Sequence, residues 1–318
     1  MTPSSAPAGA QVPPSDRQPV VRMQGVTKRI GKRTIIDNLT LEVPSGEVFG
    51  FLGPNGSGKT TTIRMMVGLM KLSQGEIFIR EHSITGAYEQ AIRYVGAIVE
   101  NPEMYKYLTG YQNLLHFARM IPGITKQRID EVVQLVGLGA RIHDKVKTYS
   151  LGMRQRLGVA QAIMHKPALL ILDEPTNGLD PAGIRELRDY LRQLAREEGI
   201  TVFVSSHLLS EMELMCDRVA IIQNGRLIDV RQIGQHQGEL ALTKVFFEVD
   251  QPQAALELLT GLGAVLEGGM LTFEGEREQI AAVNSTLVQA GLKVYGIRKH
   301  TKTLEDQFLE VTGGERIV

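Results

Sequence analysis

Eight residues, from Gly53 to Thr60, have the types and spacing of a phosphate-binding loop. They read GPNGSGKT and match the pattern G-x-x-x-x-G-K-[ST] between an expected strand and an expected helix. The glycines let backbone N–H groups wrap phosphates, Lys59 reaches the β- and γ-phosphates, and the hydroxyl of Thr60 is a ligand for Mg²⁺. The residues expected to contact the nucleotide are Gly53, Pro54, Asn55, Gly56, Ser57, Gly58, Lys59, Thr60 and Thr61.

Two adjacent carboxylates, Asp173 and Glu174, end the apolar run LLILDEP. Ligands of open α/β sheets bind at the carboxyl ends of such strands. Asp173 suits Mg²⁺, directly or through water, and Glu174 suits the deprotonation of an attacking water. In isolation, two adjacent carboxylates after a strand usually mark only an acidic boundary between the strand and a turn. With the phosphate loop upstream, the pair predicts hydrolysis of ATP with Mg²⁺ as cofactor.

The stretch YSLGMRQRLGVAQAIM, from Tyr149 to Met164, predicts a second helix whose N-terminus can bind an anion. Ser150 and Gly152 stand where the helix begins, and an apolar stripe follows. A helix N-terminus exposes unpaired N–H groups and a partial positive charge, and a serine there acts as a cap. Linear spacing leaves open whether this end meets the nucleotide of its own chain or of a second chain.

Composition excludes several classes of protein. The 318 residues contain 35 Lys and Arg against 35 Asp and Glu, so no overall charge attracts nucleic acid. The chain has a single cysteine, Cys216, which excludes an internal disulfide. We expect Cys216 to be a small, buried hydrophobic residue. No apolar run is long enough for a membrane span, and the start of the chain does not resemble a signal peptide. We therefore expect a cytoplasmic protein.

The order of elements predicts an α/β fold in two domains. Residues 1–19 are expected to be a disordered tail. Residues 20–236 begin with an antiparallel β subdomain, contain a helical subdomain at about 84–165, and have buried parallel strands at ALLILDEP and TVFVSSH. Residues 237–318 follow the order β-α-β-β-α-β of a small α+β split-βαβ domain, closed by a helix around TLEDQFLEV.

From about Val20 to Leu227 the chain resembles the ATP-binding-cassette (ABC) family. NGLD, after Glu174, is similar to the D-loop of that family, and His207 in VSSH matches its switch histidine, which contacts the γ-phosphate. YSLGM aligns with the signature usually written LSGGQ. Ser150 and Gly152 match this signature, whereas the other three residues depart from it: Tyr149, Leu151 and Met153.

The resemblance implies an ABC ATPase cassette that works as a homodimer, or as a paired cassette, with the signature of one subunit closing on the ATP held by the other. It also implies a separate polytopic membrane permease, which would place the chain at the inner face of the cell membrane. ENPEMYKYLTGYQNL, YSLGM and TLEDQFLEVTGG are most similar to exporter ATPases of the bacitracin and lantibiotic resistance group. The segment from Tyr105 to Leu115 is then a candidate groove for the permease, or otherwise a partly exposed aromatic loop.

Two positions depart from the family. The family commonly has a glutamine in GxxxQ, but this chain has Glu100. A carboxylate within about 4 Å of a phosphate oxygen would cost about 4 kcal/mol, so we expect Glu100 to face Mg²⁺, its water or the partner. Where an adenine-stacking tyrosine usually precedes GKRTIID, the chain has Ile30. We therefore expect modest nucleotide affinity unless Arg29 or another side chain substitutes, and we assign no stacking residue.

The alternative function is a soluble ABC ATPase that acts on nucleic acid or ribosomes. Members that repair DNA would need a long coiled coil or zinc-type cysteines, and this sequence has neither. Members that act in translation usually carry two cassettes, whereas this chain has one phosphate loop. The sequence therefore favours the transporter ATPase, with no nucleic-acid partner.

Overall fold

The computed structural model describes residues 18–233 and 243–299, which form two compact units. Strand β1 begins at Pro19, so all of the expected tail except its last two residues lies outside the described residues. The expected helix around TLEDQFLEV also lies outside them. Within the described ranges, the helices are too short or too polar to cross a membrane.

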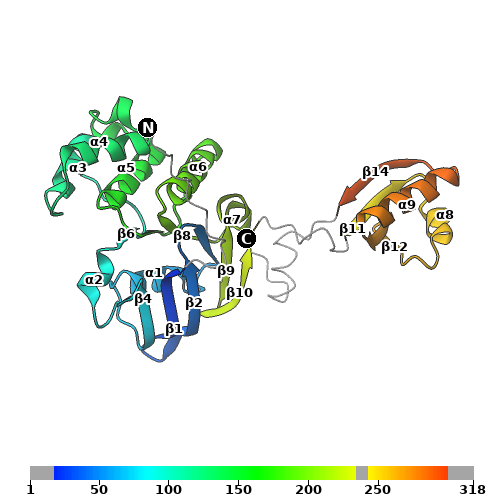
Figure 1. Cartoon of the computed structure of the whole chain (residues 1–318), viewed down its shortest axis with the longest axis horizontal. Helices are drawn as coiled ribbons and strands as arrows, with labels where there is room; N and C mark the ends of the chain where they lie inside the picture. Colours follow the sequence, from blue (N-terminus) through cyan, green and yellow to red (C-terminus); the bar gives the residue numbers. More distant parts are fainter. Residues whose placement is uncertain (1–17, 234–242, 300–318) are drawn as a thin grey trace, which may run out of the picture. The chain divides into compact units, whose positions relative to one another are not determined.

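A six-stranded sheet with the order β10-β9-β3-β8-β7-β6 is the centre of the first unit (Figure 1). Neighbouring strands from β9 to β6 run parallel, and β10 is antiparallel to β9. Every residue of β3, β7 and β8 is buried, as expected for parallel strands covered on both faces. The six strands are β3 (Val48–Leu52), β6 (Val95–Ile98), β7 (Leu169–Leu172), β8 (Thr201–Ser206), β9 (Arg218–Gln223) and β10 (Arg226–Gln232).

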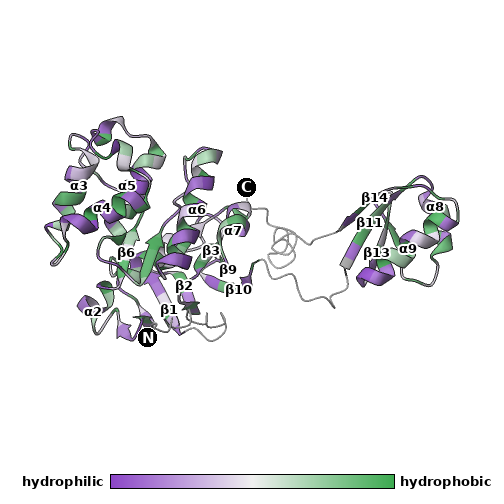
Figure 2. Cartoon of the chain, turned by 45° about the horizontal axis from the view of Figure 1, so that its top comes forward, coloured by the Kyte–Doolittle hydropathy of each residue, from purple (hydrophilic) through white to green (hydrophobic). Residues whose placement is uncertain are grey.

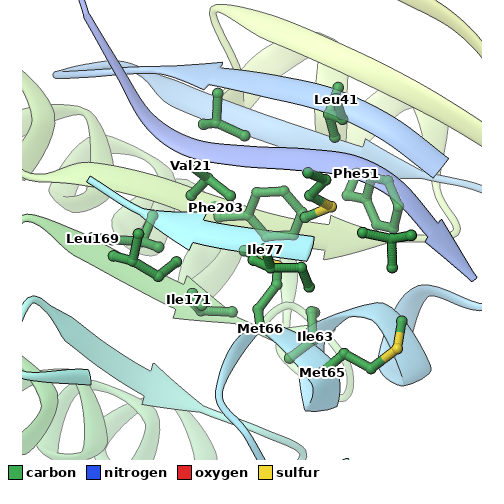
Figure 3. Close-up of a cluster of buried hydrophobic side chains, with 14 of the residues drawn as sticks. Val21, Leu41, Phe51, Ile63, Met65, Met66, Ile77, Leu169, Ile171 and Phe203 are labelled. Atoms are coloured by element: carbon green, nitrogen blue, oxygen red, sulfur yellow. The ribbon is translucent and has the colours of Figure 1, made fainter. Parts of the chain in front are cut away.

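The predicted antiparallel subdomain is a sheet with the order β2-β1-β4-β5, made of β1 (Pro19–Ile30), β2 (Arg33–Pro44), β4 (Gln74–Ile79) and β5 (His82–Ser83). Its apolar face shares one buried core with the main sheet and with helix α1 (Lys59–Met66), as Figure 3 shows. Val21 and Ile77 lie in this core together with Ile63 and Met66 of α1, all fully buried. The core therefore anchors the helix that follows the phosphate loop.

The expected helical segment contains α2 (Tyr88–Ile92), α3 (Gly110–Ala118), α4 (Lys126–Leu135) and α5 (Leu151–Ile163). It also contributes β6 to the main sheet, a strand that is not predicted from the sequence. The four residues of β6 are too few to show a period, and their pairing with β7 is not local. A Cβ at Gly96 would lie 2.1 Å from the carbonyl oxygen of Ala162, so glycine lets α5 lie against β6.

Two helices pack against β8 and β3 of the main sheet: α6 (Pro181–Glu197) and α7 (Leu209–Met215). The hydropathy of α6 alternates along its length (Figure 2), and Leu187, Leu191 and Leu194 are its buried apolar face. Cys216, directly after α7, is 1% exposed, and burial raises the pKa of its thiol. The predicted burial of this cysteine is confirmed.

The second unit has the predicted order β-α-β-β-α-β: β11 (Thr243–Val249), α8 (Pro252–Leu258), β12 (Val265–Glu267), β13 (Met270–Gly275), α9 (Arg277–Gln289) and β14 (Val294–Lys299). Its antiparallel sheet has the order β12-β13-β11-β14. Phe247, Leu271 and Leu287 are fully buried in a core of its own. The α/β fold with a small α+β split-βαβ unit is therefore confirmed.

Candidate nucleotide-binding site

The phosphate loop connects β3 to α1 and lies close against neighbouring strand ends. Gly58 has a φ of 108°, and a Cβ there would lie 2.3 Å from Cδ1 of Ile36. A Cβ at Gly53 would lie 2.3 Å from the carbonyl oxygen of Ile222. The N–H of Gly53 donates to the carbonyl oxygen of Ser206 at 3.3 Å. Backbone shape therefore favours glycine at position 58, and the close backbone of Ile222 favours it at position 53.

Lys59 is the first residue of α1 and is 6% exposed. Its Nζ donates to the carbonyl oxygens of Gly53 (2.8 Å) and Pro54 (3.3 Å), and it lies 3.2 Å from Oε1 of Glu174. The positive end of the α1 dipole adds to this charge. The hydroxyl of Ser57 is buried and has no hydrogen-bond partner in the part of the chain described. A cation, a helix N-terminus and an unpaired hydroxyl therefore suit a phosphate ligand.

Asp173 and Glu174 directly follow β7, beside the end of β8. Oε2 of Glu174 lies 2.8 Å from Nδ1 of His207, which follows β8, while Oε1 contacts Lys59. Asp173 is buried and accepts a hydrogen bond from the hydroxyl of Ser205 at 2.6 Å. The structure therefore brings Lys59, Glu174 and His207 together, with Asp173 next to them.

Thr60 and Asp173 are the fitting residues for Mg²⁺. A hydroxyl and a carboxylate are hard oxygen ligands, as this ion prefers. Within residues 18–233 and 243–299, no group of three or more His, Cys, Asp or Glu residues could hold a metal by itself. A site with one or two protein ligands of this kind would suit Mg²⁺, which keeps several waters and binds the phosphates of the substrate.

Glu100, the third predicted metal residue, forms an ion pair with Arg64 of α1. Its side chain is 62% exposed, and its φ of 68° is in the left-handed region. The pairing shows how the carboxylate is neutralised in this structure. Its role toward Mg²⁺ stays a prediction.

The predicted second helix end is present: Ser150 is the N-cap of α5, and its Oγ accepts the N–H of Met153 at 3.2 Å. Ser150 is exposed, whereas the preceding Tyr149 is buried. The Tyr149 hydroxyl donates to the carbonyl oxygen of Arg141 at 2.7 Å, and burial raises the pKa of its phenol. A Cβ at Gly110 would lie 2.4 Å from this hydroxyl. Tyr149 is thus a packing residue, and the exposed cap is Ser150.

The segment Asn177–Asp180 lies against the start of α5. A Cβ at Gly178 would be 2.9 Å from Cδ2 of Leu151, and Asp180 caps α6 by accepting the N–H of Gly183 at 2.9 Å. Among the described residues, no hydrogen bond or ion pair joins Ser150 to the phosphate loop. The capped start of α5 and the phosphate loop are therefore separate features of one chain.

A polar network lies behind the site and is not predicted from the sequence. Oε2 of Glu211 in α7 accepts hydrogen bonds from the hydroxyls of Thr176 (2.6 Å) and Ser206 (3.3 Å). Ser205 and Ser206 are fully buried at the end of β8. The two serines at the end of the apolar run TVFVSS could have indicated this network, because buried hydroxyls need hydrogen-bond partners.

Ile30, at the position of the missing stacking tyrosine, is 53% exposed. It pairs with Arg33 at the turn between β1 and β2. No described aromatic side chain is assigned to the adenine.

A mainly parallel sheet with a phosphate loop after β3 and an acidic pair after β7 defines a P-loop ATPase. The sequence profile of the ABC transporter family matches residues 36–177. The chain is 58% identical to an uncharacterized ABC transporter ATP-binding protein of Bacillus subtilis, YhcH, over 92% of this chain and 96% of that protein. It is 39% identical to the bacitracin transport ATP-binding protein BcrA of Bacillus licheniformis, over 94% of this chain and 99% of that protein.

A shorter relative is the lantibiotic transport ATP-binding protein SrtF of Streptococcus pyogenes, 39% identical over 72% of this chain and 99% of its own length. Among solved structures, cbiO1 of Clostridium perfringens, part of an ABC transporter complex, has the same fold with a TM-score of 0.63. It is 24% identical and covers 67% of this chain and 88% of its own. The chain belongs to the family of ABC transporter ATP-binding proteins. It is an ATPase of that family.

Proposed function

We propose that this chain is the ATP-hydrolysing subunit of an exporter and drives a separate membrane permease by ATP-dependent dimer closure. The observation that carries the proposal is the position of the Glu174 carboxylate, 3.2 Å from Lys59 and 2.8 Å from His207 beside the phosphate loop. A base and two groups that can contact the γ-phosphate are then in one place, as hydrolysis of a phosphoanhydride requires.

Each residue has a role in this proposal. The phosphate loop and Lys59 bind the phosphates, Thr60 and Asp173 hold Mg²⁺, and Glu174 takes the proton of the attacking water. When bound, Mg²⁺ neutralises the charge of the phosphate oxygens. The ammonium of Lys59 pairs with Glu174 in this structure, and phosphate oxygens compete for the same cation. Binding of ATP would therefore free the Glu174 carboxylate for water.

The signature end of α5 supports a role for a second subunit. Ser150 is an exposed cap, and no described contact ties it to the phosphate loop of its own chain. We infer that it binds the ATP held by a partner cassette, with His207 on the γ-phosphate from its own side. A pair of chains would then share two composite sites, and closure would depend on ATP.

The permease contact is proposed at the aromatic loop before α3. Tyr105 and Tyr107 are 41% and 68% exposed, and their ring centroids are 5.9 Å apart. Buried Asn113 holds this loop by accepting the N–H of Tyr105 at 2.8 Å and donating to its carbonyl oxygen at 3.1 Å. An exposed aromatic pair on a loop held by Asn113 suits docking of an amphipathic partner helix. Through this contact the chain would lie at the inner face of the membrane.

Export is proposed from the resemblance to exporter ATPases of the bacitracin and lantibiotic resistance group, and the names of two relatives state bacitracin and lantibiotic transport. The test is co-expression with any polytopic protein that a neighbouring reading frame encodes, followed by purification from membranes. We expect the two proteins to co-purify and the permease to stimulate ATPase activity. Tyr107→Ala should reduce this stimulation and leave the basal ATPase activity of the isolated chain unchanged. Stimulation by DNA or ribosomes, with no membrane partner, would instead support the soluble ABC ATPase.

A further inference from the structure

The hydroxyl of Ser205 contacts both acidic residues of the site. Ser205 lies at the carboxyl end of β8 and is fully buried. Its Oγ donates to Oδ1 of Asp173 at 2.6 Å and accepts the backbone N–H of Glu174 at 2.9 Å. A hydroxyl has one proton and a carboxylate only accepts, so the direction of both hydrogen bonds is fixed.

The hydrogen bond to the N–H of Glu174 restrains a turn of unusual shape. Glu174 has a φ of 48°, in the left-handed region that residues with a side chain seldom adopt. This turn brings the carboxylate to Lys59 on one side and His207 on the other. A backbone without this restraint would relax toward negative φ, and the carboxylate would leave its two partners.

An aliphatic residue in place of Ser205 would suit the rest of the strand better. Val202, Phe203 and Val204 precede it, and all are fully buried. A methyl or isopropyl group would leave the N–H of Glu174 without its partner in the interior, which destabilises the observed turn. The serine is thus explained by the site and not by the packing of β8.

We infer that Ser205 is a positioning residue for ATP hydrolysis, which acts by holding the backbone turn at Glu174 and the carboxylate of Asp173. Ser205 itself stays behind the site and does not contact the nucleotide. The inference rests on the proposed role of Glu174 as the base.

The test compares Ser205→Thr with Ser205→Val in the full chain. Both variants add branching at Cβ, but only threonine keeps the hydroxyl. We expect Ser205→Val to lower kcat by about 10- to 100-fold, with KM for ATP changed by less than about threefold, since the carboxylate is misplaced but the phosphate loop is intact. Ser205→Thr should keep most of the activity. Ser205→Ala, which adds no volume, should behave like Ser205→Val.

Thr201 provides a matched control at the opposite end of β8. It is equally buried, and its hydroxyl accepts the N–H of Gly46 at 2.8 Å. Thr201→Val should lower the thermal unfolding midpoint as Ser205→Val does, yet leave kcat unchanged. An equal loss of kcat in Thr201→Val would make the effect one of stability and overturn the inference.

The double variant Glu174→Gln with Ser205→Ala separates this inference from the proposed function. In single-turnover hydrolysis the loss caused by Ser205→Ala should be smaller in the Glu174→Gln background than in the wild type, because the part of its effect that passes through Glu174 is already absent. An inactive Glu174→Gln together with full activity in Ser205→Ala and Ser205→Val would overturn the role of Ser205 alone. Wild-type turnover in Glu174→Gln would overturn the base assignment and the inference that rests on it.

Discussion

Nδ1 of His207 lies 2.8 Å from Oε2 of Glu174, and this contact joins the carboxyl ends of two neighbouring parallel strands. Because β7 and β8 run parallel, the residues that follow them meet at one edge of the sheet. The other oxygen of Glu174 contacts Lys59 at 3.2 Å. The carboxylate is therefore held from two sides beside the phosphate loop.

Glu174→Gln should slow hydrolysis by about 100-fold or more while MgATP still binds. The amide keeps the shape of the side chain but cannot take a proton from water. The variant should therefore accumulate a dimer held by ATP. A phosphate-release assay and size-exclusion chromatography with MgATP measure both effects. Turnover near that of the wild type would remove Glu174 from the base role.

Two inactive variants should complement each other if Ser150 binds the ATP of a partner chain. Lys59→Ala damages the phosphate loop, and Ser150→Arg fills the exposed start of α5. A mixed dimer has one site with an intact loop and an intact signature, and one doubly damaged site. Mixing should therefore restore part of the dimerisation that neither variant shows with MgATP on size exclusion.

Two controls are needed for the mixing experiment. Circular dichroism must show that both variants fold, because Ser150→Arg also removes a helix cap worth about 1 kcal/mol. Labelled subunits must be shown to exchange. With both conditions met, a mixture that remains monomeric would mean that Ser150 serves its own chain or none.

Ile30→Tyr should tighten the binding of ATP and ADP equally. Ile30 is 53% exposed at the turn between β1 and β2, so a larger ring meets no buried neighbour. Base–aromatic stacking would lower Kd by up to about 10- to 100-fold. Calorimetric titration measures the change, with Ile30→Leu as an aliphatic control. Equal affinity in all three proteins would mean that another group already covers the adenine.

Deletion of all residues after Gln237 should leave a folded cassette that binds nucleotide. The second unit has its own core around Phe247 and Leu271, and SrtF is matched over 99% of its length by 72% of this chain. We propose that residues 237–318 are an accessory domain. Insoluble protein without nucleotide affinity would contradict the proposed boundary at 236/237, which lies outside the described residues.

His165, just after α5, should make the protein less stable in mild acid. Burial lowers the pKa of its imidazole, the charge of Arg128 lowers it further, and the contact of Nε2 with the carbonyl oxygen of Val95 partly opposes both. The folded pKa is thus below the unfolded value of about 6.5. The unfolded chain takes up the proton first, so stability is full above about pH 6.5 and falls below it.

The variant His165→Gln does not titrate in this range. Its thermal unfolding midpoint should therefore fall less than that of the wild type between pH 7.5 and 5.5. Buried Nδ1 of His165 has no partner among the described residues, so a proton there is not stabilised by a hydrogen bond. The same loss in both proteins would show that other groups cause it.

Features that depend on a few adjacent residues could be predicted from the amino-acid sequence alone. The loop at 53–60, the cap at Ser150 and the order of elements in the second unit follow from local spacing, turn chemistry and hydrophobic period. The loop, the cap and each single element of the second unit form within one short segment of the chain. Their physical cause is therefore contained in the segment itself, and the prediction of the fold class was confirmed.

The contacts between distant side chains could not be predicted in this way, because they depend on how the chain folds in three dimensions. Glu174 contacts Lys59 and His207, Glu211 accepts from Thr176, and Ser205 holds the turn after β7, although each pair lies far apart in the chain. The addition of β6 to the main sheet is of the same kind. Pairing between parallel strands and hydrogen bonds between buried polar groups depend on the register of distant segments, which no local pattern encodes.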